Sequence, residues 1–574
     1  MRTKSFGFIL TFIFLLLILG MLNLNVFEGY KYQELSKKNY VRLLPQIGAR
    51  GRILDRQGDI IVDNKLCYDV MILPQETSKV DEVLMSVSRI LETDFRKLKD
   101  TFRKDYIAPF APVTIAKNID VAKAAALEEL KFELSGVVIQ PRPVRRYPYG
   151  RLACHAIGYL NEIDRWRLTK LEDYGYKTKD IVGFGGVEEK YDYYLRQEEG
   201  GLSVEVDHRG KFRSVLALRP PQSGKDIQLT LDLKVQKAVE QNLVDRGGSV
   251  VIMDPYTGEI IAMASFPNFN PAIFVDKSDS SINNLFDNPE APFVNRAITG
   301  VYPAGSVFKL IVATAGLETG KINKSRSFVC SGSTKIGNME FSCWDTHGQQ
   351  NLFAAITHSC NIFFYRTGFL VGAQVIHDYA LKLGLSRPTG INLPYEAAGF
   401  VPSPLWKRIY RFKNWFDGDT ANLSIGQGDL LVTPLQITRM MAVFANQGLL
   451  VNPYIIKTID GTDVSLAQQK SINLHINPST MGYIRQALRN VVQDPAGTGH
   501  ILAMLEVQVS GKTGTVQVPH GQPHAWFVGF FPYKKARFVI CVFLEHGGSG
   551  QAACLLARQI IEEMLKEKLV ELQG

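Results

Sequence analysis

The hydrophobic pattern of the chain begins with one long apolar stretch. No charged side chain occurs from Phe6 to Phe27, whereas Arg2 and Lys4 precede this stretch. As a helix it extends about 33 Å, which is enough to cross the hydrocarbon core of a bilayer. Because positive charge stays on the cytoplasmic side, we predict a single-pass anchor with residues 1–5 in the cytoplasm and the remainder of the chain outside. A cleaved signal peptide is the alternative, but the stretch is long for one and its exit lacks an Ala-x-Ala-like site.

A different pattern follows between residues 45 and 218. Short apolar runs alternate there with glycine, proline and charged clusters. Apolar residues recur at helical spacing over Val80–Lys99 and Val121–Leu134, which predicts two helices. The region is therefore expected to form one mixed domain of helices and strands.

A linker and a second domain are predicted after residue 218. Residues 219–247 begin with a polar, proline-containing segment and continue into a strand, Asp226–Leu231, and a helix, Leu233–Val244. From 248 to 572 helical stretches surround residues 306 and 361, and apolar runs of strand length recur. These strands, the first two forming a hairpin, are expected at Ser249–Met253, Ile260–Ala264, Ala525–Phe531 and Arg537–Leu544.

Three short motifs follow one another in the second domain. They are Ser-x-x-Lys at Ser306 and Lys309, Ser-x-Asn at Ser359 and Asn361, and Lys-Thr-Gly beginning at Lys512. Each motif alone is common on a solvated helix face or in a turn. Together and in this order they are typical of penicillin-binding proteins and class A β-lactamases. The sequence therefore predicts an acyl transferase with an active-site serine.

The spacing of Ser306 and Lys309 suits nucleophilic catalysis. A serine hydroxyl is a poor nucleophile until a neighbouring base takes its proton. On a helix, residues three apart share a face, so Lys309 can be this base for Ser306. An ammonium group is not a base, so the pKa of Lys309 must be lowered by burial or by another cation. Lys512 is expected to supply that cation.

The other two motifs suit substrate recognition. Ser359 and Asn361 alternate across one residue, so both can face the same cleft, where Ser359 could relay a proton and Asn361 could hold a substrate amide. The Lys-Thr-Gly motif is expected on a β-strand, where Gly514 leaves room for a substrate backbone to pair with the strand edge. The positive charge of Lys512 and the hydroxyls of Thr513 and Thr515 suit a terminal carboxylate.

Longer segments resemble the class B penicillin-binding proteins, particularly their elongation-type peptidoglycan D,D-transpeptidases. The resemblance covers nearly the whole chain and is more specific than the three motifs. The segments that carry it are Arg50–Gly58, Arg146–Gly150, His155–Tyr159, Gly185–Glu188, Ser424–Gly428 with Thr433 and Pro434, and His524–Gly529.

This resemblance implies a fold and a reaction. The fold would be mixed α/β: an N-terminal transmembrane helix, an elongated α+β pedestal of the dimerisation type at 45–218, and a transpeptidase domain at 248–572 with an antiparallel sheet covered by helices. Ser306 would attack the D-Ala-D-Ala terminus of a peptidoglycan stem peptide and pass the acyl group to an amine on a neighbouring stem. The backbone N–H groups of Ser306 and Thr515 would form the oxyanion hole.

The resemblance also implies a biological setting. The enzyme would act in cell-wall elongation and cell shape, would be a target of β-lactams, and would work beside a membrane polymerase of the shape-elongation-division-sporulation family. Two other functions remain open. A D,D-carboxypeptidase or β-lactamase would need an activated water and no large pedestal, and a non-enzymatic β-lactam sensor or scaffold normally has several spans and an intracellular output domain.

Composition adds little to this picture. Among 574 residues, 46% are hydrophobic and 21% are charged, as in globular proteins. The formal net charge of +9 would suit an anionic envelope, but the basic residues are dispersed and no nucleic-acid-binding motif accompanies them. We therefore expect no nucleic-acid partner and no organic cofactor.

Cysteine and histidine residues cluster between the first two motifs. The seven cysteines of the chain are an odd number, which argues against a complete disulfide framework. Cys330, Cys343, His347 and His358 together offer two thiolates and two imidazoles, a ligand set for one structural zinc ion. Cys360 competes with His358 as the fourth ligand. A Cys330–Cys343 disulfide or buried free thiols are the alternatives.

Overall fold

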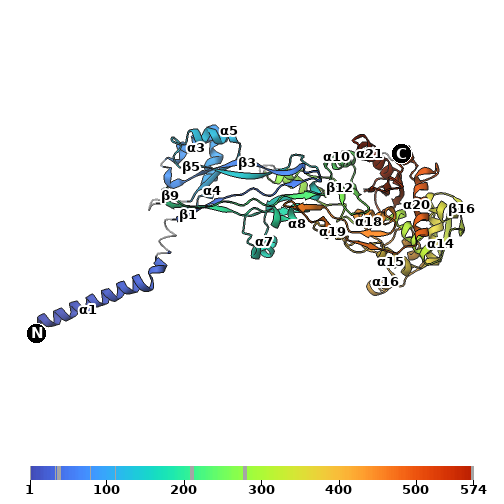
Figure 1. Cartoon of the computed structure of the whole chain (residues 1–574), viewed down its shortest axis with the longest axis horizontal. Helices are drawn as coiled ribbons and strands as arrows, with labels where there is room; N and C mark the ends of the chain where they lie inside the picture. Colours follow the sequence, from blue (N-terminus) through green and yellow to red (C-terminus); the bar gives the residue numbers. More distant parts are fainter. Residues whose placement is uncertain are drawn as a thin grey trace. The chain divides into compact units, whose positions relative to one another are not determined.

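The computed structural model describes residues 2–32, 34, 41–77, 79–109, 111–206, 212–275 and 281–570. Its residues form two compact units (Figure 1). The first comprises residues 1–51, 64–145 and 196–225, and the second comprises 52–63, 146–195 and 226–574. Residues 52–63 and 146–195 of the predicted pedestal thus cluster with the second unit.

The first unit begins with the apolar helix. Residues Phe6–Phe27 have a mean hydropathy of 2.5, and none of that helix is buried within the chain. It consists of α1 (Arg2–Leu22) followed by one π-helical turn, η1 (Asn23–Phe27). The predicted membrane-spanning stretch is therefore one helix of sufficient length and apolarity to cross a bilayer.

Two sheets follow in the first unit. One is antiparallel in the order β1-β8-β9, and the other pairs the later part of β3 with β4 and β5. Helices α3, α4 and α5 pack on the second sheet around Leu84, Val87 and Leu98. The elements are β1 (Val41–Gln46), β3 (Ile60–Ile72), η2 (Pro74–Glu76), α3 (Val80–Leu91), α4 (Phe95–Asp105), β4 (Val113–Ile119), α5 (Val121–Glu129), β5 (Val137–Arg146), β8 (Gly200–Val206) and β9 (Phe212–Arg219).

Both helices predicted in this region differ from the expectation. The single helix expected over Val80–Lys99 is two helices, because Glu92 adopts a left-handed conformation with φ of 55° and the Asp94 side chain caps a new helix by accepting from the Arg96 N–H. The helix expected over Val121–Leu134 ends at Glu129.

The second unit is built on a five-stranded antiparallel sheet. Its strand order is β12-β11-β23-β22-β21, so strands from both ends of the domain pair side by side. They are β11 (Gly248–Met253), β12 (Ile260–Phe266), β21 (Ser510–Val516), β22 (His524–Phe531) and β23 (Phe538–Leu544). The predicted hairpin and both predicted C-terminal strands are confirmed, with bounds shifted by one or two residues.

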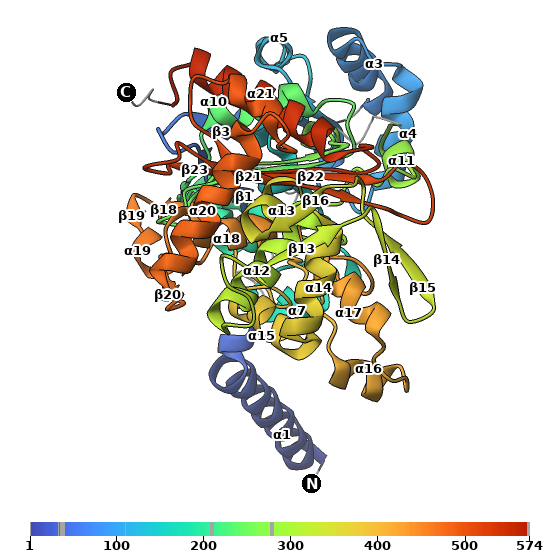
Figure 2. The same cartoon turned by 90° about the vertical axis from the view of Figure 1, so that its right-hand side faces the viewer.

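Helices bury both faces of this sheet, as Figure 2 shows. Alternate residues of β23 enter different cores: Ile540 and Val542 pack with α10 and α21, whereas Cys541 and Phe543 belong to the core that contains α12, α14 and α18. Residues of a doubly covered sheet read as continuous apolar runs. The helices are α10 (Leu233–Leu243), α12 (Lys309–Glu318), α13 (Leu352–Thr357), α14 (Asn361–Val371), α15 (Ala373–Lys382), α16 (Pro404–Tyr410), α17 (Asp417–Ser424), α18 (Pro434–Ala445), α20 (Pro478–Gln493) and α21 (Gly550–Lys566).

Smaller elements complete the second unit. Two antiparallel pairs, β13 with β16 and β14 with β15, lie between the first two motifs. The remaining elements are β2 (Ile53–Leu54), α6 (Cys154–Ile157), β6 (Tyr159–Glu162), α7 (Arg165–Leu171), η3 (Glu172–Tyr174), β7 (Ile181–Phe184), α8 (Gly186–Lys190), α9 (Asp192–Leu195), β10 (Ile227–Leu229), η4 (Pro271–Phe274), α11 (Ser281–Phe286), η5 (Gly305–Phe308), β13 (Ser327–Cys330), β14 (Ser333–Ile336), β15 (Met339–Ser342), β16 (Gly348–Asn351), β17 (Leu449–Val451), β18 (Ile456–Ile459), β19 (Thr462–Asp463), α19 (Ser465–Gln468), β20 (Ser471–Asn473) and η6 (His500–Met504).

Candidate active site

The first motif lies on a tight helical turn beside the sheet. Ser306 belongs to the 3₁₀ turn η5, which leads directly into α12 at Lys309. With three residues per turn, Ser306 and Lys309 lie on the same side. Gly305 has φ of 56°, and a Cβ there would lie 2.6 Å from Val516 Cγ2. Glycine therefore lets the turn before Ser306 pack directly against β21.

The second motif surrounds the side chain of Lys309. The fully buried Lys309 Nζ donates to Asn361 Oδ1 at 2.6 Å, to the Ser359 carbonyl at 2.8 Å and to Ser359 Oγ at 3.3 Å. Ser359 has φ of 55°, so the chain turns there and brings both side chains to the lysine. Ser359 and Asn361 thus both face the Lys309 amine.

Burial gives Lys309 the property that a general base needs. Loss of solvation lowers its pKa to about 8, although the nearby thiols of Cys343 and Cys360 favour its charged form. A substantial fraction of Lys309 is then neutral near physiological pH. The partly exposed Ser306 hydroxyl, one turn away, is the group that this amine can deprotonate.

The third motif lies on β21, as predicted. Lys512 is fully buried and its Nζ donates to the Thr513 carbonyl at 3.1 Å. Burial, followed by repulsion from Lys309, holds the pKa of Lys512 well below its usual value. Burial is the main cause for each lysine, and Lys512 is not among the groups that shift the pKa of Lys309. The expectation that Lys512 supplies the cation that lowers this pKa is therefore not supported, whereas lowering by burial is.

The two threonines of the third motif lie on the opposite strand face from Lys512, because side chains alternate along a strand. Thr513 Oγ1 donates to Thr498 Oγ1 at 2.7 Å. Thr515 is exposed, and its hydroxyl accepts from the Gly550 N–H at 3.0 Å. Thr498 was not found by sequence reasoning. A threonine between two glycines in a loop carries no distinctive signal.

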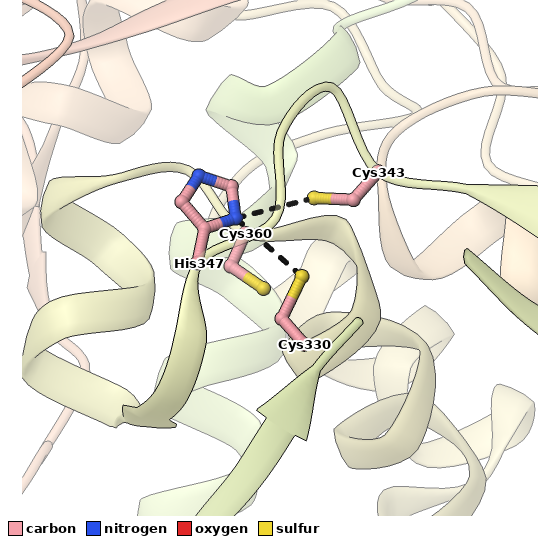
Figure 3. A group of neighbouring side chains, drawn as sticks. All are labelled: Cys330, Cys343, His347 and Cys360. Atoms are coloured by element: carbon pink, nitrogen blue, oxygen red, sulfur yellow. Dashed lines mark hydrogen bonds between the residues drawn. The ribbon is translucent and has the colours of Figure 1, made fainter. Parts of the chain in front are cut away.

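Cysteine and histidine side chains converge beside this cleft, as Figure 3 shows. The ligand atoms of Cys330, Cys343, His347 and Cys360 all lie within 4.8 Å of one another. His347 Nδ1 lies 3.5 Å from Sγ of both Cys330 and Cys343. Three thiols and one imidazole at this separation fit a closed tetrahedral zinc site. Cys330 and Cys343 are free thiols rather than a disulfide.

His358 does not join this group, and the prediction that it is the fourth ligand is wrong. Its Nδ1 lies 3.1 Å from Gln350 Oε1, and its ring stacks on His347 with 5.9 Å between centroids. Cys360, the competing candidate, lies in the group instead. It is the N-cap of α14, and the next residue, Asn361, donates its N–H to Cys343 Sγ at 3.2 Å. A hydrogen bond from Cys360, together with backbone N–H groups, lowers the pKa of Cys343 to about 4.

Ser306 lies one turn before the buried Lys309, whose pKa is lowered. The turn packs against β21, an edge strand that contains Gly514. This arrangement is that of a serine acyltransferase. Two family profiles match the chain: the penicillin binding protein transpeptidase domain over residues 248–566, and the penicillin-binding protein dimerisation domain over residues 45–229. The chain therefore belongs to the penicillin-binding proteins.

Its relatives place it more narrowly. Peptidoglycan D,D-transpeptidase MrdA of Acinetobacter baumannii is 32% identical over 94% of this chain and 84% of the relative, and that of Escherichia coli K12 is 29% identical over 96% and 91%. The structure of penicillin-binding protein 2 of Helicobacter pylori in complex with MreC superposes with a TM-score of 0.82 at 25% identity, covering 93% of this chain and all of that chain. Penicillin-binding protein 2 of Pseudomonas aeruginosa, in complex with WCK 5153, has a TM-score of 0.71 at 27% identity, with coverage of 93% and 99%. Within the family, this chain is a class B, elongation-type peptidoglycan D,D-transpeptidase of the penicillin-binding protein 2 group.

Proposed function

We propose that Ser306 cross-links peptidoglycan stems through an acyl-enzyme. Ser306 Oγ attacks the carbonyl carbon of the penultimate D-Ala, and neutral Lys309 takes its proton. The peptide bond then breaks, and terminal D-Ala leaves with a proton returned from Lys309. An amine of a neighbouring stem then attacks the ester and forms the new peptide bond, while Lys309 takes a proton from the amine and returns one to Ser306 Oγ as the ester bond breaks. The observation that supports this most directly is the buried Lys309 amine, held by Ser359 and Asn361 with a pKa of about 8.

The remaining site residues bind and orient the donor. In this proposal Asn361 holds a substrate amide, and Ser359 passes a proton between Lys309 and the leaving amine. The hydroxyls of Thr513 and Thr515 bind the terminal carboxylate, while Gly514 lets the donor backbone lie along β21. The N–H groups of Ser306 and Thr515 stabilise the oxyanion.

Product analysis tests this assignment against hydrolysis. We expect the full-length chain, given a lipid-linked glycan strand with D-Ala-D-Ala stems, to form mainly cross-linked dimers, because an amine is a better nucleophile than water towards the acyl-enzyme ester. The same strand with amidated stem termini should give little of either product, since the threonines lose their carboxylate. Tetrapeptide monomers as the main product would instead assign a D,D-carboxypeptidase.

The membrane setting is also part of this proposal. The apolar helix Phe6–Phe27 anchors the chain with Arg2 and Lys4 in the cytoplasm and the catalytic unit outside. A related structure is described as a peptidoglycan synthase complex that coordinates polymerization and crosslinking, and another contains MreC. A membrane polymerase of the shape-elongation-division-sporulation family and an MreC-like shape protein are the partners that fit. Labelling of intact spheroplasts by a membrane-impermeant penicillin tests the orientation.

The thiol cluster supports one structural zinc ion as a further part of the proposal. Cys330, Cys343, His347 and Cys360 would hold it and thereby tie the β13 end and the β15–β16 loop to the start of α14. A closed four-ligand site contributes folding stability rather than Lewis-acid chemistry. Because Cys360 lies between Ser359 and Asn361, the metal would fix the contacts of Lys309.

We expect protein purified without chelator to contain about one zinc per chain, as one closed tetrahedral site requires. His347→Ala should lose the metal and melt at a lower temperature. His358→Ala is the matched control and should keep it, because that ring faces Gln350. Metal-free protein with a Cys330–Cys343 disulfide, or zinc lost from the His358 variant alone, would contradict the proposal.

A further inference from the structure

A half-buried carboxylate contacts the segment that leads into the active-site turn. Glu545 follows β23, and its Oε1 accepts from the Tyr302 hydroxyl at 2.8 Å. Its Oε2 accepts from Arg296 Nε at 2.7 Å. The Arg296 guanidinium is itself held by the carbonyls of Glu290 at 2.7 Å and Ala291 at 3.3 Å. Glu545 is therefore fixed on one side by a buried cation and presents its other oxygen to Tyr302.

Tyr302 begins the turn that delivers the nucleophile four residues later. Its backbone exchanges two hydrogen bonds with Val432, at 2.9 and 2.8 Å, and its ring centroid lies 4.0 Å from that of Phe543. Trp526 Nε1 donates to the Pro303 carbonyl at 3.1 Å. The turn is thus held from the sheet by side chains of β22 and β23, and the Tyr302–Glu545 bond connects it to the end of β23.

The same segment also reaches the other side of the cleft. Five residues after Glu545, the Gly550 N–H donates to Thr515 Oγ1 at 3.0 Å. A Cβ on Gly550 would lie 3.0 Å from Thr513 Cβ and 3.1 Å from the Gly514 carbonyl oxygen, so a side chain there would push against β21. The segment 545–550 therefore touches both the turn before Ser306 and the strand that carries Thr515.

We propose that Glu545 is a positioning residue that sets the distance between the Ser306 and Thr515 N–H groups, and with it the geometry of the oxyanion hole. This inference rests on the proposed function. Tyr302 transmits the position of Glu545 to Ser306, and the glycine segment transmits it to Thr515. One oxyanion-hole donor is worth about 10²–10³ in rate, and small displacements of reacting groups lose part of such factors.

The chain contains a second triad of the same composition that serves as a control. Arg56 donates to Glu259 Oε2 at 3.1 Å, and the Tyr454 hydroxyl donates to Glu259 Oε1 at 3.2 Å. Tyr454 is more deeply buried than Tyr302. Among the described contacts, neither Tyr454 nor Glu259 touches a residue of the three sequence motifs. Tyr454→Phe thus removes the corresponding hydrogen bond to a glutamate, together with one from Gln469 Nε2 at 3.0 Å, without changing a residue of the three motifs.

Tyr302→Phe removes one oxygen from the full chain and tests the link. We expect the rate constant for acylation by a penicillin to fall about tenfold, which is less than the rate factor lost when a whole oxyanion-hole donor is removed. The dissociation constant of the non-covalent complex should be unchanged. A boronic acid, which places a tetrahedral oxygen in the hole when Ser306 attacks boron, should bind weaker by the same factor. Tyr454→Phe should leave both quantities at the wild-type value.

Glu545→Gln is the second variant. The double variant with Tyr302→Phe should lose no more rate than the more affected single variant, because both substitutions act on the Tyr302–Glu545 hydrogen bond. Unchanged acylation in Tyr302→Phe, or slower acylation with unchanged boronate affinity, overturns the inference. An equal loss in Tyr454→Phe would mean that such triads act only on stability. Wild-type protein that penicillin does not acylate would instead overturn the proposed function itself.

Discussion

Replacing Ser306 by alanine should abolish covalent labelling of the protein by fluorescent penicillin. The β-lactam carbonyl is attacked by the same oxygen that attacks D-Ala-D-Ala, so no acyl-enzyme can form without it. Ser306 is partly exposed in the first half of η5, and loss of its hydroxyl removes no hydrogen bond described within the fold. The melting temperature should therefore stay close to that of the wild type. Gel fluorescence and mass spectrometry of the labelled peptide measure the effect.

Ser331→Ala is a matched control, because Ser331 is exposed in the β13–β14 connection. It should label like the wild type. Labelling that persists in the Ser306 variant would remove Ser306 from the mechanism, and labelling of a different peptide in the wild type would identify the real nucleophile.

The three motifs and their elements could be predicted because they depend on neighbours in sequence. Ser306 and Lys309 are one turn apart, Ser359 and Asn361 are separated by one residue, and Lys512 lies in a run with strand periodicity. Each spacing determines a local geometry that any surrounding fold must keep. The strands of the five-stranded sheet in the second unit were predictable for a similar reason, since a sheet buried on both faces produces continuous apolar runs.

The incorrect predictions depended on contacts that sequence does not show. Helix periodicity continues from Val80 to Lys99, yet a left-handed Glu92 and the Asp94 cap divide the helix. His358 and Cys360 are two residues apart, and only the direction of the chain at the start of α14 decides which one meets Cys330. The hydrogen bond between Tyr302 and Glu545 joins residues that are 243 positions apart in the sequence. No periodicity or motif could indicate that bond.

Replacing Lys309 by alanine should slow acylation by about 10²–10⁴, the usual value of general-base assistance. The pH dependence is the more specific result. Because burial lowers the pKa of Lys309 to about 8, acylation of the wild type should rise as pH increases towards 8 and then level off, as the amine loses its proton. The base is the neutral form, so rate is lost on the acid side. Lys309→Ala should lack this limb.

A stopped-flow series with a chromogenic β-lactam between pH 5.5 and 9.5, roughly centred on that pKa, measures the profile. Lys321→Ala is the control: Lys321 is exposed just beyond α12, and the profile should not change. A limb that persists in Lys309→Ala would assign the proton transfer to another group, and Lys512 is then the candidate, because its amine is equally buried and its pKa is also lowered. Measuring Lys512→Ala and Lys309→Ala as separate variants distinguishes the two lysines. Only the variant that lacks the true base loses the pH-dependent limb, and both retain Ser306.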